Sequence, residues 1–63
     1  SVYEVEKILD FRASEDRPGF LDYLVTWKGS SDQHNSWEPE DHFQDVEIIS
    51  RFMERMRQLG RLK

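Results

Sequence analysis

The sequence predicts an α+β domain in which a three-stranded antiparallel sheet is packed by one C-terminal helix. In the first half of the chain, apolar and polar residues alternate with a period of two, whereas after Asp41 the apolar residues recur at three- and four-residue steps. The first period is typical of half-buried strands and the second of an amphipathic helix. Because a chain of 63 residues buries one small core, we expect a single domain over residues 1–63.

The first strand is expected at about residues 3–12, where four apolar residues alternate with acids: Tyr3, Val5, Leu9 and Phe11. Ile8 breaks this alternation and indicates a buried stretch or a bulge. Turn-forming residues at 14–19 then close a loop, and β-branched and aromatic residues favour a second strand at about 20–28. One face is expected to carry Leu21, Tyr23, Val25 and Trp27, and the other Asp22, Leu24, Thr26 and Lys28.

A third, short strand is expected at about residues 35–38, because the turn at 29–35 precedes it and Pro39 cannot donate to a further ladder bond. The helix is expected at about 45–59, with Asp45 capping its start and Gly60 in a left-handed conformation at its end. Its apolar stripe contains Val46, Ile49, Phe52, Met53, Met56 and Leu59. This stripe is expected to cover one face of the sheet as the second layer of the core.

Residue types that carry catalysis or bind cofactors are poorly represented. The chain has no cysteine, which excludes a disulfide framework and a thiolate zinc site and fits a reducing compartment. His34 and His42 lack the paired spacing of a metal site, and no serine stands beside a histidine at a strand-helix elbow. We therefore expect neither an enzyme nor a metal or other cofactor.

Neither membrane association nor secretion is indicated by the sequence. No apolar run approaches the ~20 residues needed to span a bilayer. The first residues also lack the basic and apolar regions of a signal peptide. We expect the chain to be a segment of a larger protein with no small-molecule substrate.

The net charge of −4 conceals an asymmetry between the two ends of the chain. Residues 1–50 contain twelve acidic and four basic residues, a charge of −8, whereas residues 51–63 contain five basic residues and one acid, a charge of +4. An acidic body favours a cationic partner, and a basic tail can touch nucleic acid. The arginines of the tail lie on two neighbouring helix faces without an aromatic stacking platform, so we expect at most a weak, nonspecific contact.

Eight of the 63 residues are aromatic, more than a small core needs. Five of them are expected to be core residues: Phe11, Phe20, Tyr23, Phe43 and Phe52. Tyr3, Trp27 and Trp37 remain, and of these Tyr3 and Trp27 are the candidates for ligand binding.

The sequence resembles the chromodomains of the heterochromatin-protein and Polycomb types. The matching segments occur in the same order over nearly the whole chain: Val2-Tyr3-Glu4-Val5-Glu6-Lys7-Ile8-Leu9-Asp10, Tyr23-Leu24-Val25-Thr26-Trp27-Lys28-Gly29 and Asn35-Ser36-Trp37-Glu38-Pro39-Glu40. The resemblance implies a small barrel-like fold with Trp37 in the core. It also implies a nuclear protein that binds a histone tail carrying a methylated lysine.

By this resemblance, Tyr3 and Trp27 are two walls of an aromatic cage around the methylated lysine. Aromatic ring faces stabilise a quaternary ammonium by cation–π attraction. The third wall is usually an aromatic residue directly after Trp-Lys-Gly, where this chain has Ser30. His34 lies where the family often has an acid at the rim, and its imidazole is an alternative replacement for the missing ring.

The resemblance also implies a peptide groove, in which a histone tail adds as a strand between residues 2–5 and residues 40–44. The residues that it assigns to this groove are Val2, Glu4, Val5, Glu38, Asp41, His42 and Gln44. Val5 would form an apolar pocket and Glu38 would accept a hydrogen bond from the peptide. Val2 and Gln44 would close over the peptide, and His42 replaces an asparagine that commonly holds it.

Three functions remain open on the sequence alone. The first is a reader of a methylated lysine in the histone H3 tail, in the context of lysine 9 or lysine 27, weakened by Ser30. The second is a degenerate chromodomain that acts as a protein-protein or targeting module of a larger protein, such as a retroelement integrase. The third is a nucleic-acid binder that uses the basic helix.

Overall fold

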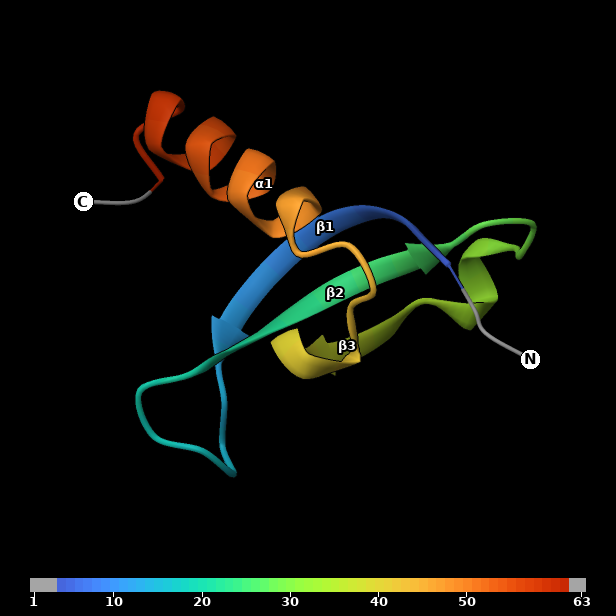
Figure 1. The fold of residues 1–63 in the computed structure, drawn as a ribbon, viewed down its shortest axis with the longest axis horizontal. Helices are drawn as coiled ribbons and strands as arrows, with labels where there is room; N and C mark the ends of the chain where they lie inside the picture. The colour runs from blue at the N-terminus through green and yellow to red at the C-terminus, as the bar shows by residue number, and fades with distance from the viewer. Residues whose placement is uncertain (1–3, 62–63) are drawn as a thin grey trace.

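The computed structural model describes residues 4–61 and contains three strands followed by one α-helix (Figure 1). The elements are β1 (Val5–Ala13), β2 (Leu21–Trp27), the 3-10 turn η1 (Asp32–His34), β3 (Ser36–Pro39), the 3-10 turn η2 (Glu40–His42) and α1 (Glu47–Gln58). The predicted α+β fold is therefore confirmed, with strand and helix limits within two residues of those expected. Within residues 4–61 no helix has the length and apolar character required to cross a membrane.

The three strands form an antiparallel meander in the order β1-β2-β3. Val25 in the central strand pairs with Ile8 of β1 and with Ser36 of β3, and its side chain is fully buried. A central strand is covered by neighbours on both edges, so its inward residues form the middle of the core.

Strand β1 contains two bulges, and they decide which of its residues reach the core. The register with β2 shifts between Val5 and Lys7 and again between Ile8 and Asp10. A bulge adds one residue to a strand and bends it. Ile8 consequently becomes buried, whereas Leu9 is 45% exposed. The irregularity predicted at Ile8 is confirmed, but the assignment of Leu9 to the core face was wrong.

Thr26 is a second departure from simple alternation. It was expected on the polar face, yet it is buried, and its Oγ1 accepts a hydrogen bond from the Lys7 backbone N–H at 3.2 Å. The bulge beside Val5 displaces Lys7 relative to β2, so the threonine hydroxyl serves as the acceptor there. A buried hydroxyl is tolerated when it is hydrogen-bonded in this way.

The core joins the sheet to the helix through aromatic rings. Its buried residues are Ile8, Tyr23, Val25, Phe43, Ile49 and Phe52. The Phe52 ring meets those of Phe11 and Tyr23 edge to face at centroid distances of 5.9 and 6.3 Å, and Tyr23 meets Phe43 at 5.7 Å. Such pairs add to the stabilisation that comes from burial.

Two aromatic residues expected in the core lie elsewhere. Phe20 is 54% exposed and carries the Arg17 guanidinium 4.9 Å from its ring centroid, because it precedes β2 at the end of a loop. Trp37 is half-buried, and the Arg12 guanidinium lies 4.2 Å from its ring centroid. Trp37 pairs with Leu24, one residue from the core-facing Tyr23, and neighbouring strand residues face opposite sides of a sheet.

The two ends of α1 are formed as the sequence predicts. The Asp45 carboxylate accepts a hydrogen bond from the Glu47 backbone N–H at 3.0 Å, which satisfies a free donor in the first turn. At the other end Gly60 has a φ of +73°, and the N–H of Arg61 donates to the Met56 carbonyl at 2.8 Å. This arrangement is a Schellman motif, which requires a left-handed residue such as glycine.

The apolar stripe of α1 is longer than the surface that it covers. Ile49 and Phe52 are buried, and Ile48, Met53 and Met56 pack against the core at the sides. Val46 and Leu59 at the two ends are 55% and 63% exposed, so their expected burial was wrong. For Leu59, Figure 1 shows the reason, since α1 begins beside β1 and its C-terminal end extends away from the sheet.

Candidate functional site

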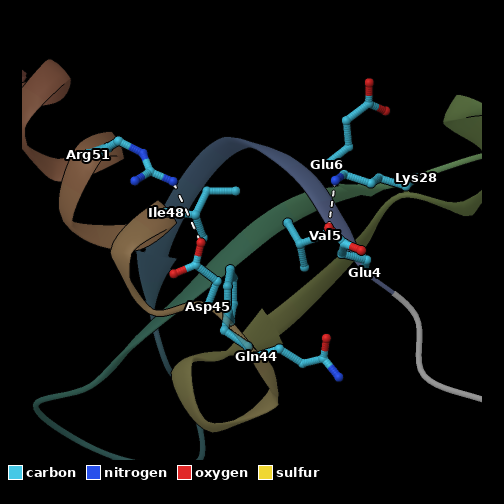
Figure 2. A pocket seen from close by; sticks show the side chains of 9 residues that line it. Glu4, Val5, Glu6, Lys28, Gln44, Asp45, Ile48 and Arg51 are labelled. Carbon is cyan, nitrogen blue, oxygen red and sulfur yellow. Dashed lines mark hydrogen bonds and ion pairs between the residues drawn. The ribbon is translucent and has the colours of Figure 1, made fainter.

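A depression of about 210 Å³ opens between the start of β1 and the segment that leads into α1. In Figure 2, Val5 and Ile48 lie on opposite sides of it, and the Glu6 side chain points outward. The residues that line it are Glu4, Val5, Glu6, Lys28, Phe43, Gln44, Asp45, Ile48 and Arg51. We call this depression the groove.

The structure brings together only part of the predicted site. Glu4, Val5 and Gln44 line the groove, whereas Glu38, Asp41 and His42, on β3 and η2, are not among its lining residues. The predictions for Val2 and Tyr3 fall outside the described residues.

The first wall of the groove continues the sheet beyond the N-terminal end of β1. Val5 pairs with Trp27, and the Lys28 backbone N–H donates to the Glu4 carbonyl at 2.9 Å. The Lys28 ammonium also lies 2.5 Å from the Glu4 carboxylate, and this hydrogen bond raises the pKa of Lys28 above its usual value. Backbone pairing thus fixes the apolar Val5 side chain directly beside Trp27.

The opposite wall is held by Phe43. Its N–H donates to the Glu40 carbonyl at 3.0 Å, which closes the η2 turn, and its buried ring packs against Tyr23. Burial, followed by the charge of Glu40, raises the pKa of the Tyr23 phenol above 10.0. Because Phe43 is anchored in the core, the adjacent Gln44 is fixed at the rim of the groove.

A chain of hydrogen bonds runs from Trp27 across β3 to η2. The indole Nε1–H of Trp27 donates to Ser36 Oγ at 3.1 Å, and the Ser36 hydroxyl donates to Glu38 Oε2 at 2.7 Å. The other oxygen of Glu38 lies 2.7 Å from His42 Nδ1, which donates to the carboxylate. Since every member is bonded, the chain restricts the rotation of the half-buried Trp27 ring.

Replacing Ser36 by alanine is expected to destabilise the domain by about 0.5–1.5 kcal/mol, because both of its side-chain hydrogen bonds are lost. The indole N–H of Trp27 should also exchange faster with solvent. Urea unfolding and NMR hydrogen exchange measure these effects, and Ser50→Ala, on the exposed side of α1, is the control. Equal exchange rates for wild type and Ser36→Ala would contradict the restraint on Trp27.

Ser30 and His34 follow Trp27 in an exposed turn. Gly29 has a φ of +77°, and the Ser30 N–H donates to the Trp27 carbonyl at 3.1 Å. A left-handed glycine allows this tight turn, which leaves the Ser30 side chain exposed. His34 is also exposed, and its Nδ1 lies 3.3 Å from Ser31 Oγ.

Asp41 has a partner from a distant part of the chain. Its Oδ1 accepts a hydrogen bond from Arg17 Nη2 at 2.7 Å, and its Oδ2 lies 3.5 Å from Arg17 Nη1. This two-point contact joins η2 to the loop between β1 and β2. The hydrogen bond from Arg17 lowers the pKa of Asp41 below 3.8.

The stabilisation from this ion pair should depend on pH. Because the folded-state pKa of Asp41 is depressed, the contribution is complete above about pH 4 and is lost as the pH falls through the folded value. We expect Asp41→Asn to melt below the wild type at neutral pH and at the same temperature at strongly acidic pH. Thermal unfolding of both proteins between neutral and strongly acidic pH tests this expectation. A difference in melting temperature that persists in acid would show that Asp41→Asn destabilises the domain for another reason.

The charges that line the groove favour a cationic or hydrogen-bonding ligand. The Lys28 ammonium is paired with Glu4, and Arg51 lies 3.7 Å from Asp45 and 3.5 Å from Glu47. Glu6 has no ion-pair partner within the described part of the chain, although its charge also contributes to the raised pKa of Lys28. Residues 4–61 contain no group of three or more His, Cys, Asp or Glu side chains suited to a metal ion.

Sequence reasoning missed the contribution of α1 to the site. Ile48 and Arg51 of α1, and Asp45 just before it, line the groove, although the helix was expected to cover the sheet and to add at most a weak, nonspecific contact with nucleic acid. The short sequence distance between the helix and the groove could have indicated this contribution, because α1 begins at Glu47, shortly after the predicted wall at residues 40–44. Its first turns must therefore adjoin that wall. The role of Ser36 was also missed, since a strand serine gives no indication of its cross-strand partner.

Comparison with known proteins shows which sequences this chain is similar to. Residues 3–55 match the family model of the chromo (chromatin organisation modifier) domain. The chain is 38% identical over 58 residues to human chromobox protein homolog 8, which covers 92% of the chain and 14% of that protein.

Two further relatives have similar coverage. The chain is 43% identical over 54 residues to mouse chromobox protein homolog 2, covering 86% of the chain and 10% of that protein. It is 47% identical over 45 residues to human testis-specific chromodomain protein Y 1, covering 71% and 8% respectively. The chain thus spans about a tenth of the length of these relatives.

Proposed function

The chain belongs to the chromo domain family, and we propose that it is a chromatin-binding module that reads a methylated lysine in a histone H3 tail. Chromo domains are binding modules rather than enzymes. The observation that carries the proposal is the position of the Trp27 ring, which is restrained by its hydrogen bond to Ser36 and belongs to the residue paired with Val5, a lining residue of the groove.

In the proposed complex, Trp27 forms one wall around the methylated ammonium and Tyr3 forms a second. A trimethylated lysine keeps its charge but has lost its hydrogen-bond donors, so a ring face stabilises it by ~0.5–2 kcal/mol. Ser30 offers no ring at the third position. Loss of one ring costs ~1 kcal/mol or more, about tenfold in affinity, and we therefore propose weak binding.

The peptide itself is proposed to enter the groove as an added strand. Val5 and Ile48 offer an apolar floor for a small side chain, and Gln44 lies at the rim. Glu38 is proposed to accept a hydrogen bond from the residue next to the methyl-lysine. Its carboxylate is already bonded to Ser36 and His42, so the peptide would join an existing network.

The proposed target is a trimethyl-lysine in an Ala-Arg-Lys-Ser context, that of lysine 9 or lysine 27 of histone H3. The acidic body of the domain, with a charge of −8 over residues 1–50, favours such a basic tail. Binding there would place the protein in the nucleus. His34 and His42 are proposed to border the peptide at the cage rim and along η2.

A degenerate chromo domain that serves as a protein-protein or targeting module of a larger protein is the second candidate. The exposed Ser30 at the third cage position favours it. Such a module would bind its partner through the groove without regard to lysine methylation.

Titration with matched unmethylated and trimethylated H3 peptides distinguishes the two candidates. Isothermal titration calorimetry should give a higher affinity for the trimethylated peptide. Identical affinities would contradict the reader function and support the second candidate.

Introducing an aromatic ring at the third cage position should strengthen the complex. We expect Ser30→Tyr to tighten binding of the trimethylated peptide by about 0.5–2 kcal/mol, because a ring would then face the ammonium. The fold should be retained, since Ser30 is exposed. Calorimetry measures the change, and Ser31→Tyr, one position further along the same turn, is the control.

Unmethylated peptide should bind Ser30→Tyr and the wild type equally. An unaltered affinity for the trimethylated peptide would mean that His34 or another side chain already fills this place, or that no cage forms.

A further inference from the structure

A second depression adjoins the groove on the side away from Trp27. It also has a volume of about 210 Å³ and lies between β1 and α1. Its lining residues are Glu6, Lys7, Ile8, Ile48, Arg51, Phe52 and Arg55. Glu6, Ile48 and Arg51 line both depressions, so the two form one continuous surface.

The charge of the second depression is opposite to that of the groove. Lys7, Arg51 and Arg55 surround it, and Glu6 is the one acid among its lining residues. Arg51 already forms ion pairs with Asp45 and Glu47. Within residues 4–61, Lys7 and Arg55 have no carboxylate in ion-pairing distance. Their two positive charges are therefore available to a ligand.

The position of these cations relative to Trp27 follows from the register of the sheet. Val5 pairs with Trp27, and Lys7 and Ile8 lie two and three residues further along β1. Because the bulge after Val5 places Lys7 opposite Thr26, the neighbour of Trp27, Lys7 lies no more than about 7 Å, the length of two regular strand residues, beyond Val5 along the strand. A peptide strand that runs beside β1 would reach Lys7 about two to four residues from the side chain bound at Trp27.

We propose that the depression formed by Lys7, Arg51 and Arg55 binds an anionic side chain of the same peptide whose methyl-lysine lies at Trp27. This inference rests on the proposed function and extends it to a second feature of the ligand. A phosphorylated serine or threonine is the strongest candidate anion, because arginine and lysine bind phosphate through charge-assisted hydrogen bonds.

A peptide is favoured over nucleic acid by the surroundings of the three cations. The depression has an apolar floor of Ile8 and Phe52, and residues 1–50 carry a charge of −8. An acidic body repels a polyanion along its length, but it opposes a single anionic side chain much less. Continuity with the groove also provides a path for a peptide chain.

The test uses trimethyl-lysine peptides in which phosphoserine, glutamate or serine occupies each position on either side of the methyl-lysine. At one or a few positions, about two to four residues away, phosphoserine should tighten binding about threefold to tenfold over serine at low ionic strength. Glutamate should give a smaller gain. Lys7→Gln/Arg55→Gln should abolish the gain.

The control is Arg57→Gln/Arg61→Gln, which removes the same charge from residues outside the depression and should keep the gain. Circular dichroism checks that both variants fold. If methylation still strengthens binding but phosphoserine has no effect, the anion site is wrong while the reader function stands. A gain that survives Lys7→Gln/Arg55→Gln also overturns the proposal.

Two remaining outcomes concern the reader function and nucleic acid. Loss of methyl discrimination with a retained phosphoserine gain would overturn the joint mode of binding, and absence of all peptide binding would overturn both proposals. A duplex or single-stranded oligonucleotide is titrated in parallel. If binding of the oligonucleotide requires Lys7 and Arg55 while binding of the phosphoserine peptides does not, the depression binds nucleic acid and the proposal is wrong.

Discussion

Replacement of Phe52 by alanine is expected to leave the domain largely unfolded. The Phe52 side chain is 3% exposed and joins α1 to Phe11 and Tyr23. Truncation of a buried phenylalanine costs about 3–5 kcal/mol. At about 0.05–0.15 kcal/mol per residue, a domain of this size has a total stability of about 3–9 kcal/mol. The substitution therefore removes a large part, or all, of the net stability.

Far-ultraviolet circular dichroism and urea unfolding measure this effect. Leu59→Ala is the matched control, because Leu59 belongs to the same apolar stripe but is 63% exposed, and it should change the unfolding free energy by less than about 0.5 kcal/mol. A cooperative transition for Phe52→Ala within about 1 kcal/mol of the wild type would show that α1 is not essential to the core.

Replacement of Trp27 by alanine is expected to abolish discrimination between methylated and unmethylated peptides. The proposed cage already lacks a ring at Ser30, so removal of Trp27 leaves Tyr3 as its one aromatic wall. The variant should bind both peptides with equal, low affinity in calorimetric titrations. Methyl discrimination retained in a folded Trp27→Ala domain would place the ammonium elsewhere.

Trp27→Phe separates the ring from its hydrogen bond. Phenylalanine keeps a π face but cannot donate to Ser36, so part of the discrimination should remain. Ser36→Ala provides the complementary change, because it keeps the indole and removes its acceptor. Similar losses in these two variants would identify orientation of the ring as the main contribution of Ser36.

Periodicity in the sequence predicts the fold because one face of each element is buried. It predicts β2 well, since Tyr23 and Val25 are buried in register. It fails in β1, where two bulges expose Leu9 and bury Ile8. A bulge depends on pairing with another strand, and local alternation does not determine where the extra residue is placed.

Prediction of the site was limited in the same way by contacts between distant residues. Resemblance to chromo domains identified Glu4, Val5 and Gln44, which line the groove. It assigned Asp41 to the groove, but this carboxylate binds Arg17. Neither this contact nor the chain from Trp27 to His42 has a pattern in the linear sequence, because each joins side chains brought together by the turns around β3.

The contact between Arg17 and Asp41 has a consequence for altering the length of the chain. Surface loops usually tolerate insertions at small thermodynamic cost. The loop between β1 and β2 is different, because Arg17 anchors η2, and η2 leads directly to the Phe43 and Gln44 wall of the groove. Extra residues beside Arg17 would weaken this contact between the hairpin loop and η2, so a reporter or affinity tag belongs elsewhere in the chain.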